Sequence, residues 1–324
     1  MSKRVNCPNG SEPDPIPVPP HPKKRRIPLP NMVPKSVSED PDAPERLAAI
    51  LESGTYREAQ RDTDFLSGPD MRGVRLLLDY EKTEACLRAK HIEGTIVVFG
   101  STRLREPAVA EHNLKAVRCA LEQDPDNEIL RSQVEITERL CQKSRYYEVA
   151  REFARLVNQS QEQLRTHRLR IMTGGGPGIM EAANRGSFDV GAESIGLNIT
   201  LPHEQYPNPY ITPDLCYLFH YFSIRKLHFL QRAKALVAFP GGYGTFDELF
   251  ETLTLIQTRV MSPVPVILVG ETYWRQAVNI DFLVAEGVID PEDRELFWYA
   301  ETAVEIWKGI AAWHRLNGAP LGTL

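Results

Sequence analysis

Three glycines and two carboxylates lie close together in residues 240–248, which read PGGYGTFDE. The apolar run 235–239 before this stretch predicts a buried strand, and apolar residues recur at helical spacing over 246–253. The chain is therefore expected to make a tight turn from strand to helix. Such a turn suits a phosphate group, because glycines leave the backbone accessible and a helix start presents unpaired N–H groups with partial positive charge. The expected phosphate contacts here are Gly241, Gly242, Gly244 and Thr245.

Two further strand ends carry glycine turns of the same kind. Residues 173–178 read TGGGPG between a predicted strand and a predicted helix, and a Gly-Ser pair at 100–101 follows the first predicted strand. Three such turns at one edge of a sheet favour a phosphate-bearing ligand over the structural alternative, in which glycines only let helices pack close to strands. The additional candidate contacts are Gly174, Gly175, Gly176, Gly178, Gly100 and Ser101.

The spacing of these glycines argues against two common nucleotide-binding loops. Ile179 and Glu181 occupy the positions where the dinucleotide pattern G-x-G-x-x-G needs its third glycine or alanine, and no stretch matches the triphosphate loop G-x-x-x-x-G-K-[ST]. NAD and ATP chemistry therefore lose support, and a nucleoside monophosphate or a sugar phosphate remains as the expected ligand.

Glu248 is the candidate acid, and it has a structural alternative. Thr245 and Glu248 have the spacing of a capping box, in which the glutamate accepts a hydrogen bond from the threonine N–H at a helix start. Pattern alone favours this role, because capping boxes are commoner than catalytic glutamates. Arg225 and Lys226 lie at the start of another predicted helix, off its apolar stripe, where cations oppose the helix dipole. This position favours an anionic partner, such as the substrate, although two solvated charges would give the same pattern.

The elements that would position these residues alternate along the chain. Apolar strands are expected at 95–99, 169–173, 194–199, 235–239 and 264–269, and the alternating aromatic residues at 217–222 favour strand core over stacking on a purine. Helices are expected over 106–159 with a break at 124–127, over 177–185 with Gly186 closing the helix, from residues 223, 245 and 273 onward, and over 303–316. This pattern predicts a doubly wound, Rossmann-like α/β fold, in which helices cover both faces of a parallel sheet and ligands bind at the carboxyl ends of its strands.

Three segments are predicted along the chain. Twelve of the 25 prolines precede Glu45, interleaved with polar residues and the basic run at 23–26, so residues 1–45 are expected to be a disordered tail without an assigned role. Residues 46–93 are a predicted N-terminal helical extension, and residues 94–324 the Rossmann-like, nucleotide-binding catalytic domain.

Composition limits the classes of partner and cofactor. With 324 residues, 25% charged and 42% hydrophobic, the chain is ordinary for a soluble protein, and its net charge of -5 gives no overall reason to bind nucleic acid. It has no apolar run of about 18 residues and no apolar leader, so we expect a cytoplasmic protein without a membrane partner. The five cysteines are scattered and the histidines lack metal-ligand spacing, so neither disulfides nor a metal site is expected.

Taken together, these motifs identify a family resemblance. Residues 240–248 fit the signature P-G-G-x-G-T-x-x-E of the LOG ("lonely guy") phosphoribohydrolases, proteins often mislabelled lysine decarboxylases. Arg225 stands upstream where that family has its arginine, and the block GGGPGIME at 174–181 is a second match. The likeness covers about residues 94–274 and leaves out the proline-rich tail. The helical extension before the first strand resembles that of a longer subgroup.

The resemblance implies hydrolysis of the N-glycosidic bond in AMP, or in an N6-modified, cytokinin-type AMP, to free base and ribose 5-phosphate. It implies that Arg225 and Glu248 are the catalytic pair, that no cofactor takes part, and that the protein is a homodimer or larger homo-oligomer. Cleaving this bond builds positive charge on the ribose, and a carboxylate near the anomeric carbon would stabilise that charge or activate the attacking water. Arg225 would hold the nucleotide or orient Glu248.

Two other functions remain open at this point. A non-catalytic nucleotide or cofactor carrier would use the same fold and phosphate turn, and the joint presence of Arg225 and Glu248 argues against it. An interaction protein acting through its tail is the other, and deletion of residues 1–45 without effect on activity would exclude it. Lysine decarboxylation would need a lysine that binds pyridoxal phosphate, and no sequence context identifies one.

Overall fold

The computed structural model describes residues 27, 29, 32–162, 169–202, 206–318 and 321. Most of the predicted tail, including Cys7, lies outside these residues. The chain divides into two compact units between Met71 and Arg72. The predicted extension 46–93 is therefore shared between them, because its last helix, α3 (Arg72–Ala89), belongs to the larger unit.

Short helices make up the described part of the smaller unit. They are α1 (Ala43–Glu52), α2 (Thr63–Ser67) and single 3-10 turns at 54–56, 59–61 and 69–71. Asp62 caps α2, since its carboxylate accepts a hydrogen bond from the N–H of Phe65 at 3.1 Å. None of the residues in these short helices is buried. Local capping and turn contacts therefore define these elements, rather than a core of their own.

The larger unit is built on a sheet of seven parallel strands, which confirms the predicted fold class. The strands are β1 (Gly94–Phe99), β2 (Leu169–Thr173), β3 (Ser194–Ile199), β4 (Cys216–Phe219), β5 (Ala233–Ala238), β6 (Val266–Val269) and β7 (Trp298–Ala300). Their order is β4-β3-β2-β1-β5-β6-β7. The buried aromatics Tyr217 and Phe219 lie in β4, as their alternation favoured, whereas the short strand β7 was not predicted.

The strand order reverses between β1 and β5. Strands β2 to β4 are added on one side of β1, and β5 to β7 on the other, so the loops that follow β1 and β5 diverge at the carboxyl edge. The segments that leave β1 and β5 stay hydrogen-bonded just beyond the strands. The N–H of Phe239 donates to the carbonyl of Phe99 at 2.8 Å, and the N–H of Ser101 donates to the carbonyl of Pro240 at 2.9 Å. In open α/β sheets this switch point is where ligands bind.

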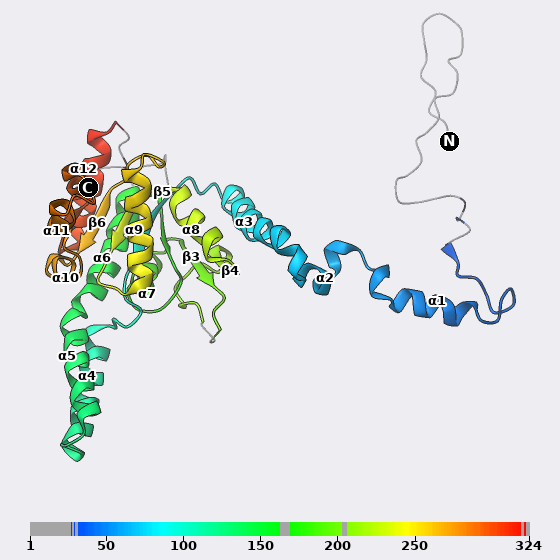
Figure 1. The fold of residues 1–324 in the computed structure, drawn as a ribbon, viewed down its shortest axis with the longest axis horizontal. Coiled ribbons are helices and arrows are strands. Elements are labelled where there is room, and N and C mark those ends of the chain that lie inside the picture. Colours follow the sequence, from blue (N-terminus) through cyan, green and yellow to red (C-terminus); the bar gives the residue numbers. More distant parts are fainter. Residues whose placement is uncertain are drawn as a thin grey trace, which may run out of the picture. The chain divides into compact units, whose positions relative to one another are not determined.

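Helices cover both faces of the sheet (Figure 1). Besides α3, they are α4 (Pro107–Gln123), α5 (Glu128–Lys143), α6 (Arg145–Glu162), α7 (Ile179–Asp189), α8 (Phe222–Gln231), α9 (Tyr243–Gln257), α10 (Glu271–Ala277), α11 (Ile280–Ala285) and α12 (Ala303–Leu316). None of the helices in the described ranges is long and apolar enough to cross a membrane. The four cysteines that the structure describes are free thiols.

The predicted helical region 106–159 is three helices rather than two. The expected break at 124–127 is present, and Asn127 caps α5 by accepting hydrogen bonds from the N–H groups of Ile129 and Leu130, each at 3.1 Å. A second break at Ser144 separates α5 from α6 and was not predicted, because no glycine or proline marks it. Helices α4 and α5 lie side by side (Figure 1).

Gly186 does not close its helix as predicted. It lies within α7, which continues to Asp189. A Cβ at this position would overlap the backbone carbonyl of Arg151 on α6. The glycine therefore lets α6 and α7 approach each other closely, a packing role that the local sequence does not reveal.

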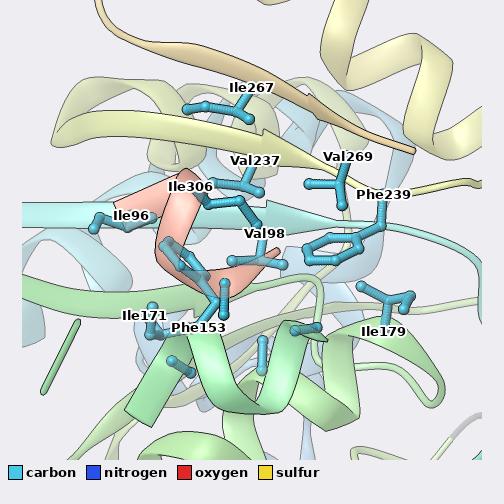
Figure 2. Packing of buried hydrophobic residues seen from close by; sticks show 14 of the residues in the cluster. Ile96, Val98, Phe153, Ile171, Ile179, Val237, Phe239, Ile267, Val269 and Ile306 are labelled. Atoms are coloured by element: carbon cyan, nitrogen blue, oxygen red, sulfur yellow. The ribbon is translucent and has the colours of Figure 1, made fainter. Parts of the chain in front are cut away.

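Two apolar clusters lie on opposite faces of the sheet. Alternate residues of β1 enter different clusters, because successive side chains of a strand point to opposite faces. Ile96 and Val98 pack with Phe153 of α6 and Ile306 of α12 (Figure 2). On the other face, Val97 and Phe99 belong to a cluster that also holds Leu87 of α3, Phe229 of α8 and Leu249 of α9. The helices α8 and α9, which carry the predicted catalytic pair, are thus packed on a single face of the sheet.

Candidate active site

A cavity of about 690 Å³ lies at the switch point between β1 and β5. Its wall brings together predicted residues from the loop after β1, from the turn after β5, and from helices α8 and α9. These are Gly100, Ser101, Arg225, Gly241, Gly242, Gly244, Thr245 and Glu248. Such a volume suits a small organic ligand.

The turn at the start of α9 leaves room for a ligand. Its N-cap is Gly242, which has no side chain to satisfy the first N–H groups of the helix. A Cβ added at Gly242 or Gly244 would meet no atom within 4 Å, whereas one at Gly241 would overlap Thr245. The hydroxyl of Tyr273 donates a hydrogen bond to the carbonyl of Gly241 and holds the turn. Gly241 is thus needed for the turn itself, and the other two glycines leave its cavity side open.

The capping box expected from Thr245 and Glu248 is not formed. Helix α9 begins at Tyr243, and the N–H of Thr245 donates to the backbone carbonyl of Gly242 at 2.9 Å. Glu248 therefore lies beyond the first turn. Its Oε2 is buried and accepts no hydrogen bond within the described structure. A buried carboxylate oxygen without a partner is costly, so its retention in a ligand-sized cavity points to a functional role.

Burial dominates the electrostatics of Glu248, whose exposed fraction is 5%. Burial raises the pKa of its carboxyl from 4.5 to about 7. The cations Lys226 and Arg225 oppose this rise, while the neighbouring carboxylates of Glu251 and Asp247 add to it. Glu248 can therefore exchange a proton near neutral pH.

Arg225 is held in place by backbone carbonyls. Its Nε donates to Leu197 at 2.6 Å and its Nη2 to Gly174 at 3.3 Å, and the guanidinium lies 5.1 Å from the ring centre of Phe229. Burial lowers its pKa and the charge of Glu248 opposes that shift. A guanidinium still stays protonated at physiological pH, so Arg225 presents a fixed positive charge to the cavity.

Lys226 does not line this cavity, although it was predicted to contact the substrate. Its Nζ lies 2.7 Å from Oδ1 of Asp247 and 3.2 Å from Oε2 of Glu251. Burial would lower the pKa of Lys226, but these carboxylates and the nearby Glu248 outweigh it and raise the pKa. Its cation is therefore paired within the chain and acts on Glu248 through charge.

The glycine turn at 174–178 does not line the cavity either. Gly174, Gly175, Gly176 and Gly178 are buried by protein atoms. Gly175 and Gly178 have positive φ angles of 74° and 76°, and a Cβ on them would overlap Asn198 and the carbonyl of Ser101 respectively. A Cβ on Gly174 would overlap Arg225. In this chain the turn supports the β1 loop and Arg225 instead of facing the cavity.

Several cavity residues were missed from the sequence. Arg103 follows the β1 turn, Tyr273 lies in α10, and α5 contributes a whole face. The α5 residues of the cavity wall are Ile136, Arg139, Leu140 and Lys143. Their spacing of three, four and seven residues marks one helical face, which the sequence could have revealed. Among the described residues, no cluster of three or more histidine, cysteine, aspartate or glutamate side chains could hold a metal ion.

Similarity to known proteins bears on the chemistry of this cavity. A family described as "Possible lysine decarboxylase" matches residues 180–310, which include Arg225 and the whole of α9. The cytokinin riboside 5′-monophosphate phosphoribohydrolase LOG5 of Arabidopsis thaliana is 27% identical over 164 residues, 48% of this chain and 69% of that protein. LOGL5 of Oryza sativa subsp. japonica, named a probable enzyme of the same type, is 30% identical over 139 residues, 42% of this chain and 55% of its own length. The chain is therefore similar to LOG phosphoribohydrolases over part of its length.

Part of the cavity comes from outside the region that the family model matches. Residues 180–310 hold α8, α9 and Tyr273, whereas the β1 loop and α5 precede them. A solved structure, the molybdenum cofactor binding protein of Rippkaea orientalis, is 18% identical with a TM-score of 0.35, covering 51% of this chain and 87% of that protein. The fold class of this chain therefore rests on its own parallel sheet and strand order.

Proposed function

We propose that this protein hydrolyses the N-glycosidic bond of a purine nucleoside 5′-monophosphate, either AMP or an N6-modified AMP. The products would be the free base and ribose 5-phosphate. The observation that carries the proposal is the buried carboxylate of Glu248, whose Oε2 has no partner in the described structure and which shares a cavity with the open glycine turn of α9. The phosphoribohydrolase names of the relatives agree with it.

The proposed chemistry needs a carboxylate and a water molecule. Water adds to C1′ of the ribose as the bond from C1′ to the base breaks, and the bonding electron pair leaves with the base. Glu248 takes the proton of the attacking water and stabilises the positive charge that develops on the ribose. A pKa of about 7 keeps this carboxyl close to the pH at which a general base is most efficient.

Arg225 and the turn after β5 would position the nucleotide. The N–H groups at the start of α9 suit the 5′-phosphate, which supplies binding energy away from the reacting bond. Arg225 cannot move freely, because two carbonyl oxygens hold its guanidinium. We assign it the role of orienting Glu248 and the ribose.

The test is release of free base from AMP and from N6-modified AMP by the purified full chain. Glu248→Gln removes the charge while keeping the shape, and should lower the rate about 100-fold or more. Glu251→Gln is the matched control on the same helix, since Glu251 is outside the cavity wall and Asp247 still pairs with Lys226. It should keep activity within a few-fold. Tight binding of AMP by the wild type without release of base would instead make the protein a nucleotide carrier.

A further inference from the structure

The α5 side of the cavity wall carries two cations to which the proposed reaction assigns no role. Arg139 and Lys143 line the cavity, one turn apart at the carboxyl end of α5. Arg139 lies 3.6 Å from Glu135 on its own helix. Lys143 is half-buried, and in the described part of the chain it has no ion-pair or hydrogen-bond partner. A half-buried lysine without a partner, at the wall of a cavity, suggests an anionic ligand.

The end of α5 is anchored above the carboxyl end of β5. Tyr146, three residues after Lys143, packs its ring 6.4 Å from that of Phe239. A Cβ added at Gly270 would meet the Tyr146 hydroxyl at 2.6 Å and the Pro240 ring at 3.3 Å. Tyr146 and Pro240 therefore both lie next to Gly270. Pro240 opens the glycine turn that leads into α9. The lysine therefore approaches the cavity from the side of that turn.

Hydrogen bonds at Glu301 fix this junction. Its carboxylate, just after β7, accepts from Arg145 at 2.7 Å, from the Tyr146 hydroxyl at 3.2 Å and from the N–H of Glu271 at 2.9 Å. The break between α5 and α6 is thus tied to the ends of both β6 and β7. A side chain held from such a junction can act with precision, because its helix is not free to swing away.

The charges of the cavity wall are not balanced. Among the described residues that line it, the cations are Arg103, Arg139, Lys143 and Arg225, of which Arg139 lies 3.6 Å from Glu135, and the acids are Asp247 and Glu248. Asp247 is already paired with Lys226, which lies outside the wall. Glu248 is partly protonated near neutral pH, because its pKa is about 7. The cavity therefore favours a ligand with more than one negative charge, as a phosphate monoester has.

We propose that Lys143 binds the 5′-phosphate of the substrate from beside the α9 turn and so makes the site select nucleotides over nucleosides. The glycine turn supplies backbone N–H groups to the phosphate, and Lys143 supplies full positive charge, with Arg139 one turn away as a second cation. This assignment rests on the proposed function for the identity of the ligand. The selecting residue then lies on α5, outside the region that matches the family.

Calorimetric titration of the full chain with AMP tests this assignment without requiring turnover. Lys143→Gln should weaken AMP binding about tenfold or more, since a charge-assisted hydrogen bond is lost. Lys143→Arg keeps the charge and should stay within about threefold of the wild type. Lys115→Gln is the matched control, because Lys115 is an exposed lysine on α4 that does not line the cavity. It should bind AMP as the wild type does.

The outcomes separate this proposal from the proposed function. Unchanged AMP affinity in Lys143→Gln overturns the phosphate role, and so does an equal loss in Lys143→Arg, which would make the lysine a packing residue. If the affinities follow the expected order but no base is released, the hydrolase assignment fails and the phosphate role stands. If base is released but the affinities of the Lys143 variants do not follow the expected order, the hydrolase assignment stands and the phosphate role of Lys143 fails. A wild type that does not bind AMP overturns both.

Discussion

Nη2 of Arg225 donates a hydrogen bond to the carbonyl of Gly174 at 3.3 Å, joining two motifs that are 51 residues apart in the chain. The contact needs glycine at 174, because a Cβ there would overlap the guanidinium. The glycine turn after β2 therefore works as a support for Arg225. The turn after β5 is the one that faces the cavity. Two similar glycine motifs thus have different tasks in one site.

Release of base should depend on the ionisation of Glu248. Its carboxylate is the active form in the proposed reaction, and its pKa is about 7. The rate should therefore rise with pH through about 7 and level off above it. The measurement is a pH profile of kcat/KM for AMP. A rate that falls above this pH would show that the protonated carboxyl is the active form, and would make Glu248 a general acid.

Lys226 should tune this pH dependence from outside the cavity. Its positive charge lowers the pKa of Glu248, so Lys226→Gln should raise that pKa and move the rising limb of the profile to higher pH. Glu251→Gln should move the limb the opposite way, because the charge of Glu251 raises the pKa. Comparing the limb positions of the two variants and the wild type tests both signs. Limbs that coincide would mean that neither charge acts on the catalytic group.

Glu248→Gln should stabilise the protein while it removes activity. The pKa of the carboxyl is higher in the folded chain, about 7, than its ordinary value of 4.5, so the folded state binds more protons between these values. Stability from this group is therefore full below pH 4.5 and declines as the pH rises toward 7. Relative to the variant, the wild type should lose about 3 kcal/mol by pH 8. Urea unfolding of both proteins at pH 4.5 and pH 8 measures the difference, and equal stability at pH 8 would contradict the burial of this charge.

Gly242→Ala should weaken nucleotide binding without unfolding the protein. Its φ of -104° suits alanine, and the new methyl group would meet no protein atom within 4 Å. It would instead occupy the ligand side of the turn. Calorimetry with AMP should show a loss of about tenfold at an unchanged melting temperature. Gly241→Ala is the contrasting variant, because its methyl group would overlap Thr245 and should lower the melting temperature. Undiminished AMP affinity in Gly242→Ala would place the phosphate elsewhere.

Asp79 of α3 should affect catalysis through Arg225. Its Oδ2 accepts hydrogen bonds from the N–H groups of His220 at 2.8 Å and Tyr221 at 2.9 Å, which lead directly into α8. Asp79→Ala should free this helix start, lower stability by about 1 kcal/mol and reduce kcat. Asp79→Asn keeps an acceptor oxygen and should recover most of both. Loss of stability without any change in kcat would restrict Asp79 to a structural role.

Local patterns in the sequence predicted most of the sheet. Five strands are long or apolar enough to stand out, and parallel pairing follows from the helices between them. Strand β7 has only three residues and forms by pairing with β6, so its local sequence does not predict a strand. The break at Ser144 is missed for a similar reason, because contacts of Tyr146 and Arg145 with distant strand ends determine where α5 stops.

By itself, the sequence predicted a phosphate turn from the local spacing of the glycines at 241–244, and its resemblance to a known family predicted Arg225 and Glu248 as the catalytic pair. Tertiary structure decided which of these groups face a common cavity. It turned the expected capping glutamate into a buried acid whose Oε2 has no hydrogen-bond partner among the described residues, since the helix begins two residues before Thr245. It also buried the second glycine turn and brought Lys143 to the cavity wall. Burial and the meeting of distant segments depend on how helices pack across the sheet, and no local pattern encodes that packing.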